Sequence, residues 1–133
     1  MKFLLDTETI GYIINNKYPS VRKHLENKIL LKADIAISVV SETDLLYRIN
    51  HKKSSHILKQ ALQDFLNLVT ILPWDSKAAK AYVQISFLHE NKGITPPLFD
   101  MLIAAHALAE NRVLISSSPL YPALNITTEN WTA

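Results

Sequence analysis

The sequence predicts an α/β fold of three layers, in which helices flank a mainly parallel central sheet. Short apolar segments alternate along the chain with longer segments of helical periodicity, and this alternation is typical of parallel sheets covered on both faces. The composition is that of an ordinary globular protein, with 48% hydrophobic and 20% charged residues. The length of 133 residues fits one domain spanning residues 1–133.

The first predicted elements lie in the N-terminal third of the chain. The apolar run 3–5 predicts a strand, and the apolar spacings within 10–14 and 21–29 predict two helices. Residues 35–40 predict a second strand. Ser41 is expected to cap the helix that follows this strand.

The middle of the chain continues the alternation. Ser54 or Ser55 would begin a helix, because serine side chains accept hydrogen bonds from the first turn. Residues 69–72 predict a third strand, and Asp75 is expected to cap the next helix, through about residue 90.

The C-terminal third is predicted to hold one long helix and two strands. Pro96 and Pro97 suit the first turn of a helix that runs to about Asn111. Residues 113–115 predict a fourth strand, and a last short strand is expected near 125–127.

Several classes of protein are excluded or disfavoured by composition. Cysteine is absent, which rules out disulfides, thiol nucleophiles and cysteine-bound zinc, and which fits the cytoplasm. Asp6 and Glu8 cut the first apolar run too short for an export signal, and no run is long enough to span a membrane. The net charge of +2 does not by itself indicate a nucleic-acid partner.

Three aspartates are expected at the edge of the sheet where the strands end. Asp6 follows the first strand, Asp44 lies in the first turn after the second, and Asp100 begins the helix that leads into the fourth. Ligands of open α/β sheets bind at this edge. Asp100 is the most informative, because its helix is apolar nearly all round and a buried carboxylate is costly unless it is paired or binds a cation.

Each aspartate also has a structural interpretation. Asp6 could cap the first helix, and Asp100 could be an acid favoured by the helix dipole. Asp44 stands in the acidic position of a capping box that starts at Ser41. Taken alone, Asp44 is best explained as structural, whereas Asp100 favours a functional site.

A cluster of carboxylates without cysteine suits a hard cation such as Mg²⁺ or Mn²⁺. Such an ion can activate water and stabilise charge on a phosphate. Zinc is disfavoured, because the five histidines form no pair at the spacing of a helical zinc site. His106 is interpreted as a core histidine.

Six segments match, in order, the motifs of one known family. They are residues 3–7, 37–47, 72–75, 95–107, 113–116 and 129–131. The segment around Asp100 is the closest match, and the order and spacing are more specific than any one segment. Together they resemble the PIN-domain ribonucleases of VapC type, the toxins of type II toxin–antitoxin pairs, across the whole chain.

The resemblance implies a PIN-like fold and a metal-dependent endoribonuclease. Asp6, Asp44 and Asp100 would be catalytic residues that hold Mg²⁺ or Mn²⁺, and a metal-activated water would attack an RNA phosphodiester. Similar toxins pair with a small VapB-like antitoxin and commonly form homodimers, so both partners are expected here.

The chain departs from the family pattern at the site itself. Ser117 and Ser118 stand where the family has Asn or Asp after the fourth strand, and Asp44 replaces the usual glutamate. Glu8 occupies a position that is usually Asn or Ser. Our hypothesis is that Glu8 partly replaces the missing acid, while Ser117 and Ser118 orient water or phosphate. A site that lacks one carboxylate is expected to have weaker activity.

A basic stretch lies beside the predicted site. Arg48, Lys52, Lys53 and Lys59 could contact RNA phosphates, with an affinity that falls with salt. A solvated turn between two helices would explain the same residues.

Two alternatives remain. The serines also suit a catalytically impaired PIN relative that acts as an RNA- or protein-binding module. The pair Asp6 and Glu8 resembles the first motif of DnaQ-like exonucleases, but that family needs an aspartate five residues after its late histidine. Here Asn111 follows His106 at that spacing, and a helix is predicted where that fold has strands.

Overall fold

The computed structural model describes residues 1–51, 53–93 and 95–133. Their strands form one five-stranded sheet in the order β3-β2-β1-β4-β5, and every pair of neighbours is parallel. The strands are β1 (Lys2–Leu5), β2 (Asp34–Ser38), β3 (Thr70–Leu72), β4 (Val113–Ile115) and β5 (Thr128–Glu129). The predicted parallel α/β sheet is therefore confirmed.

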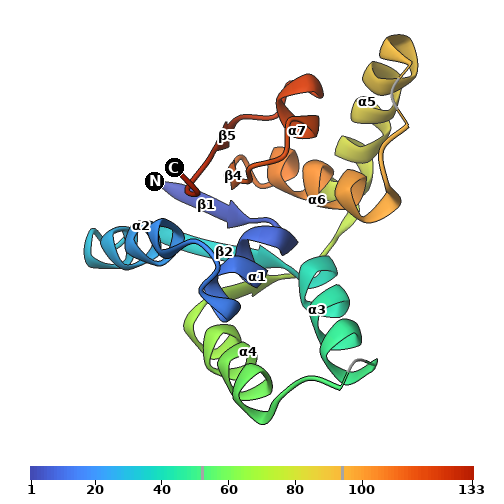
Figure 1. Ribbon diagram of the computed structural model, residues 1–133. Coiled ribbons are helices and arrows are strands. Elements are labelled where there is room, and N and C mark those ends of the chain that lie inside the picture. Colours follow the sequence, from blue (N-terminus) through green and yellow to red (C-terminus); the bar gives the residue numbers. More distant parts are fainter. Residues whose placement is uncertain (52, 94) are drawn as a thin grey trace.

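Helices cover both faces of this sheet (Figure 1). In chain order they are α1 (Thr7–Asn15), α2 (Pro19–Leu30), α3 (Val39–His51), α4 (His56–Leu68), α5 (Ser76–Lys92), α6 (Leu98–Ala109) and α7 (Leu120–Ala123). Helices α1, α2 and α4 pack on one face of the sheet, and α5, α6 and α7 pack on the other. Helix α3 begins where β2 ends and contacts α1, α4 and α6. No described helix is both long and apolar enough to cross a membrane.

The central strand shows why both faces must be covered. Phe3 and Leu5 belong to the core under α1, α2 and α4, whereas Leu4 belongs to the core under α5 and α6. All three side chains are completely buried. Successive side chains of a strand point to opposite faces, so an uninterrupted apolar run requires apolar layers on both.

The predicted boundary between β2 and α3 was wrong. The strand ends at Ser38 and the helix begins at Val39, so Ser41 lies inside α3 and is not its cap. The Ser38 hydroxyl accepts the N–H of Val40 at 3.0 Å, and Ser41 is buried and accepts a hydrogen bond from the Thr7 hydroxyl at 3.0 Å. Val39 and Val40 are residue types that favour strands, which explains why the sequence placed the boundary two residues too late.

The C-terminal region also differs from the prediction. The last strand is Thr128–Glu129, beyond the expected residues 125–127, and a short unpredicted helix, α7, precedes it. Thr128 pairs with Leu114 of β4, so the position of β5 is set by its pairing with β4. Local caps were predicted better, since Ser55 accepts from Leu58 N and Asp75 accepts from Ala78 N.

Candidate active site

Asp6 lies at the carboxyl end of β1 and begins α1. Its Oδ1 accepts the backbone N–H of Thr9 at 2.8 Å, and the residue is only 4% exposed. Burial raises the pKa of Asp6; hydrogen bonds from Ser116 and Thr9 partly offset this, and the charge of Glu8 raises it further. Asp6 is therefore a helix cap and, at the same time, a carboxylate held in an unfavourable environment.

Asp100 lies in the first turn of α6 and is half-buried. Its pKa is raised by burial first and then by the negative charges of Asp6, Glu8 and Asp44. The charges of Asp6, Glu8 and Asp44 therefore act on Asp100, and we call the region around these four acids the acidic site. That the three aspartates form one metal site stays a prediction; Glu8, exposed on α1, adds its charge to the same region.

Asp44 is engaged by a neighbour on α3. Arg48 Nε and Nη2 donate to Asp44 Oδ1 and Oδ2, both at 2.9 Å, so the guanidinium binds the carboxylate through two parallel hydrogen bonds. The Asp44 side chain is 17% exposed and that of Arg48 is 53% exposed. The capping-box interpretation of Asp44 was therefore wrong, because Ser41 is not a cap. The four-residue spacing on a helix could have revealed the ion pair.

Two tyrosines border the acidic site, and neither was predicted. Tyr121, on α7, is buried, and the pKa of its phenol is raised by burial and then by the charges of Asp100, Asp6 and Glu8. Tyr12 Oη donates to Glu8 Oε2 at 3.4 Å. The spacing of Glu8 and Tyr12 on α1 indicates their contact, whereas nothing in the sequence indicates Tyr121.

The serines after β4 have defined local roles. Ser116 Oγ accepts the N–H of Ser118 at 3.0 Å, and Ser118 Oγ accepts the N–H of Leu120 at 3.2 Å. A side-chain hydrogen bond with Ser117 lowers the pKa of Tyr12, against the larger effect of burial. Ser118 thus stabilises the turn into α7, while Ser117 lies within hydrogen-bonding reach of Tyr12.

The basic stretch lies at the end of α3 and the start of α4. Arg48, Lys53 and Lys59 are exposed to solvent. Lys52 lies outside the described residues. The predicted RNA-contacting side chains that can be placed are thus accessible, and Arg48 joins this stretch to the acidic site through Asp44.

The acidic site offers only oxygen donors, which suits Mg²⁺ or Mn²⁺. A divalent cation would relieve the mutual repulsion that raises the pKa of Asp100. Within residues 1–51, 53–93 and 95–133, no three acids or histidines stand close enough to make a ready-formed metal cage. The arrangement therefore fits a cation held by few direct carboxylates, with Asp44 available only if it leaves Arg48.

Comparison with known proteins assigns the family. The model of the PIN domain matches residues 3–118. Ribonuclease VapC2 of Rickettsia felis is 31% identical over 134 residues, which cover 98% of each chain. The tRNA(fMet)-specific endonuclease VapC of Shigella flexneri is 26% identical over 118 residues, covering 89% of this chain and 87% of that one.

A solved structure gives the same result. The crystal structure of VapBC2 from Rickettsia felis, bound to a DNA fragment from the promoter, has a TM-score of 0.90 at 30% identity, covering 98% of this chain and 99% of that one. The helix that directly follows β1 also disfavours the DnaQ-like alternative, which expected strands there. The chain belongs to the PIN-domain family, among the ribonucleases of VapC type.

Proposed function

We propose that this protein is a metal-dependent endoribonuclease and the toxin of a VapBC-type pair. The observation that carries the proposal is that Asp100 is half-buried in α6 and that the negative charges of Asp6, Glu8 and Asp44 raise its pKa. Perturbed carboxylates of this kind are costly to the fold and cluster at functional sites. The relatives named as ribonucleases support the reaction class.

Asp6 and Asp100 would hold Mg²⁺ or Mn²⁺, with Glu8 and Asp44 completing the site directly or through water. The bound ion supplies a water of lowered pKa and neutralises charge on the scissile phosphate. Thr9 and Ser116 orient the Asp6 carboxylate by hydrogen bonds. Ser117 would bind water or a phosphate oxygen without adding charge.

Two features would make this site weaker than one with four free carboxylates. Ser117 and Ser118 bring no negative charge to the end of β4, and Arg48 occupies both oxygens of Asp44. We propose that Glu8 compensates in part, since its charge reaches both Asp6 and Asp100.

A VapB-like antitoxin is the expected protein partner, because the Rickettsia felis neighbour is a VapBC2 complex. We propose that an apolar segment of it occupies the cleft between α1, α2 and α4, which has a volume of about 370 Å³. Apolar side chains make up most of the lining of this cleft, and the lining also holds charges of both signs, which would pair with the antitoxin. The lining includes Ile13, Leu25, Ile29, Phe65 and Leu68, with Arg22, Glu26 and Asp64.

A second copy of this chain is the other proposed partner. Val83 and Phe87 are exposed on one face of α5. Leu98 and Phe99 are exposed at the start of α6, which packs against α5. Apolar side chains gathered on neighbouring helices mark a candidate interface. Sedimentation of Phe87→Glu beside the wild type tests it, with a monomeric variant as the expected result. A location in the cytoplasm, where an RNA substrate would be found, stays a prediction.

The deciding experiment is RNA cleavage by the purified chain in Mg²⁺ or Mn²⁺, with EDTA and Asp100→Asn as controls. Cleavage that needs the metal and is lost in the variant establishes the nuclease. A folded chain that does not bind metal and does not cleave any RNA would instead support the catalytically impaired module. Ser117, Ser118 and the Arg48–Asp44 pair would then mark an inactive site.

A further inference from the structure

An exposed pair of aromatic rings lies on α3. The rings of Tyr47 and His51 are stacked, with centroids 4.0 Å apart and planes 18° from parallel. His51 Nδ1 is also hydrogen-bonded to the Tyr47 carbonyl oxygen at 2.9 Å, which fixes the imidazole over its neighbour. Tyr47 is 62% exposed, and His51 is exposed as well. The two rings therefore form an ordered stack on the surface, with both side chains in contact with solvent.

Burial does not explain this stack. The chain has a second histidine stack, His24 on Trp131, with centroids 5.7 Å apart. Trp131 is 1% exposed and contributes to the core, so that contact is part of the packing of the fold. Neither Tyr47 nor His51 belongs to a core cluster.

The pair shares a helix face with the acidic site. Tyr47 and His51 follow Asp44 by three and seven residues, positions that lie above one another on an α-helix. At about 1.5 Å per residue, His51 stands about 10 Å along the axis from Asp44. Arg48 lies between them on the same face and holds Asp44. A chain of nucleotides that runs along this face from the acidic site would pass over the rings.

The surroundings carry positive charge. Residues 45–63 contain four Lys or Arg residues, two His residues and no Asp or Glu. Arg48, Lys53 and Lys59 are exposed among them. Such a surface attracts a phosphate backbone, and aromatic rings among basic residues are the combination that binds single-stranded nucleic acid.

We propose that Tyr47 and His51 form a stacking platform for a nucleobase of single-stranded RNA next to the cleaved phosphate. The inference rests on the proposed ribonuclease function and adds a binding subsite to it. Every base has a π-face, so the platform would bind unpaired RNA with little preference for sequence, while Arg48 and Lys53 contact the backbone. It would select for a loop or a single strand, because a paired base cannot lie on the rings.

The test uses a single-stranded RNA oligonucleotide with a 3′-fluorescein and 2-aminopurine placed at successive positions, bound to the Asp100→Asn protein so that no cleavage occurs. Anisotropy gives the affinity, and 2-aminopurine fluorescence reports stacking directly. Removing the aromatic partner of one stacked base weakens binding about tenfold, so Tyr47→Ala in this background is expected to show that loss and to abolish the quenching at one position.

The matched variants separate stacking from other effects. Tyr47→Phe and His51→Phe keep a ring and should keep both affinity and quenching. Leu30→Ala truncates an exposed side chain of α2, away from the site, and should change neither. Lys53→Ala should lower the dependence of affinity on salt, whereas Tyr47→Ala should leave that dependence unchanged, because no phosphate contact is lost.

The outcomes distinguish the platform from the function on which it rests. If Asp100→Asn binds RNA and Tyr47→Ala binds it equally well, with quenching retained, the platform is wrong and the nuclease stands. If Tyr47→Ala changes the sedimentation of the free protein or its binding to an antitoxin but not to RNA, the rings belong to a protein interface and the proposal is overturned. If no RNA binds and the wild type cleaves none, both proposals fail.

Discussion

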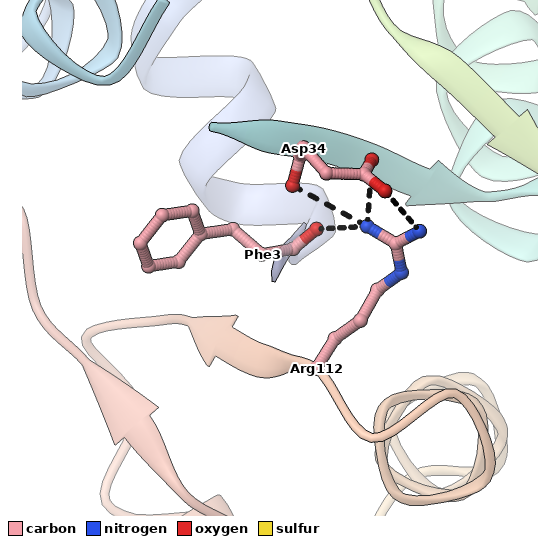
Figure 2. A network of polar contacts seen from close by, with 3 residues as sticks. All are labelled: Phe3, Asp34 and Arg112. Atoms are coloured by element: carbon pink, nitrogen blue, oxygen red, sulfur yellow. Dashed lines mark hydrogen bonds and ion pairs between the residues drawn. The ribbon is translucent and has the colours of Figure 1, made fainter. Parts of the chain in front are cut away.

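Arg112 binds Asp34 through both terminal nitrogens of its guanidinium, with Nη1 at 3.0 Å from Oδ1 and Nη2 at 3.1 Å from Oδ2 (Figure 2). Nη1 also donates to the carbonyl oxygens of Phe3 at 3.2 Å and of Asp34 at 3.3 Å. These residues belong to or adjoin β1, β2 and β4, at the end of the sheet opposite the acidic site. One side chain thus ties the three central strands together at their amino ends.

Replacing Arg112 should therefore destabilise the fold without affecting the acidic site. The Arg112 side chain is 7% exposed and that of Asp34 is 46% exposed, so the carboxylate can return to water but the two carbonyls lose a donor. We expect Arg112→Ala to lower the free energy of unfolding by about 1–3 kcal/mol, measured by urea denaturation. Arg112→Lys should recover only part of this, because an ammonium cannot form the two parallel bonds. Loss of Mn²⁺ binding at unchanged stability would contradict this assignment.

Most of the fold could be predicted because its elements have local causes. Ser55 and Asp75 cap the helices that begin one residue later, and the apolar run of β1 needs no distant information. The Arg112–Asp34 pair joins residues 78 positions apart, and the strand order depends on distant pairings such as Phe3 with Val113. The sequence carries no local pattern for either. The extent of the single domain, residues 1–133, stays a prediction.

The acidic site could be predicted only in outline. Asp6 was identified from its place at a strand end, Asp100 from the apolar helix around it, and Asp44 mainly from the family resemblance. The sequence did not reveal the surroundings that set their properties. Tyr121 lies on a helix that was not predicted, and it feels the charges of the acidic site. The ion pair between Arg48 and Asp44 was missed because Asp44 was interpreted as part of a capping box.

Arg48→Ala should strengthen metal binding. The variant frees both oxygens of Asp44 and removes a positive charge that lowers the pKa of Asp100. An exposed ion pair on a helix is worth little, so we expect Mn²⁺ to bind about two- to fivefold more tightly by isothermal titration calorimetry. Arg22→Ala serves as the control, since Arg22 donates to Ile13 O, away from the acidic site. Equal affinity in all three proteins would show that Asp44 is not a ligand.

Glu8→Gln should weaken metal binding. The charge of Glu8 reaches Asp6 and Asp100, and its removal leaves the site with less negative charge to hold a cation. We expect the dissociation constant for Mn²⁺ to rise about fivefold or more, in line with the loss of a group that supports a metal site. Glu42→Gln on α3 is the matched control, because residues two apart on a helix cannot face one site, and Glu42 lies two before Asp44. Unchanged affinity in Glu8→Gln would remove Glu8 from the site.

Asp100→Asn should stabilise the metal-free protein. The pKa of Asp100 is raised in the folded state, so the folded protein favours the neutral form, and ionisation at neutral pH costs stability that returns as the pH falls through that pKa. The neutral amide removes this cost. We expect Tm in EDTA to rise by about 2–5 °C at pH 7.5 and the difference to shrink at lower pH, measured by calorimetry. Saturating Mn²⁺ should reverse the order of the two proteins, and a variant that melts below the wild type in EDTA would contradict the repulsion.

The buried His106 should make the protein sensitive to mild acid. Its Nδ1 lies 2.8 Å from Ser38 Oγ, at the end of β2, and burial lowers the pKa of the imidazole. The unfolded chain therefore takes up a proton at about pH 6.5 while the folded chain does not, so the free energy of unfolding falls as the pH drops below that value, by at most about 1.4 kcal/mol per pH unit. Urea denaturation between pH 8 and pH 5 measures the slope. His106→Gln keeps a polar group near Ser38 but cannot take up the proton, so its stability should depend less on pH over this range even if it is lower throughout. The same slope in both proteins would assign the acid sensitivity to groups other than His106.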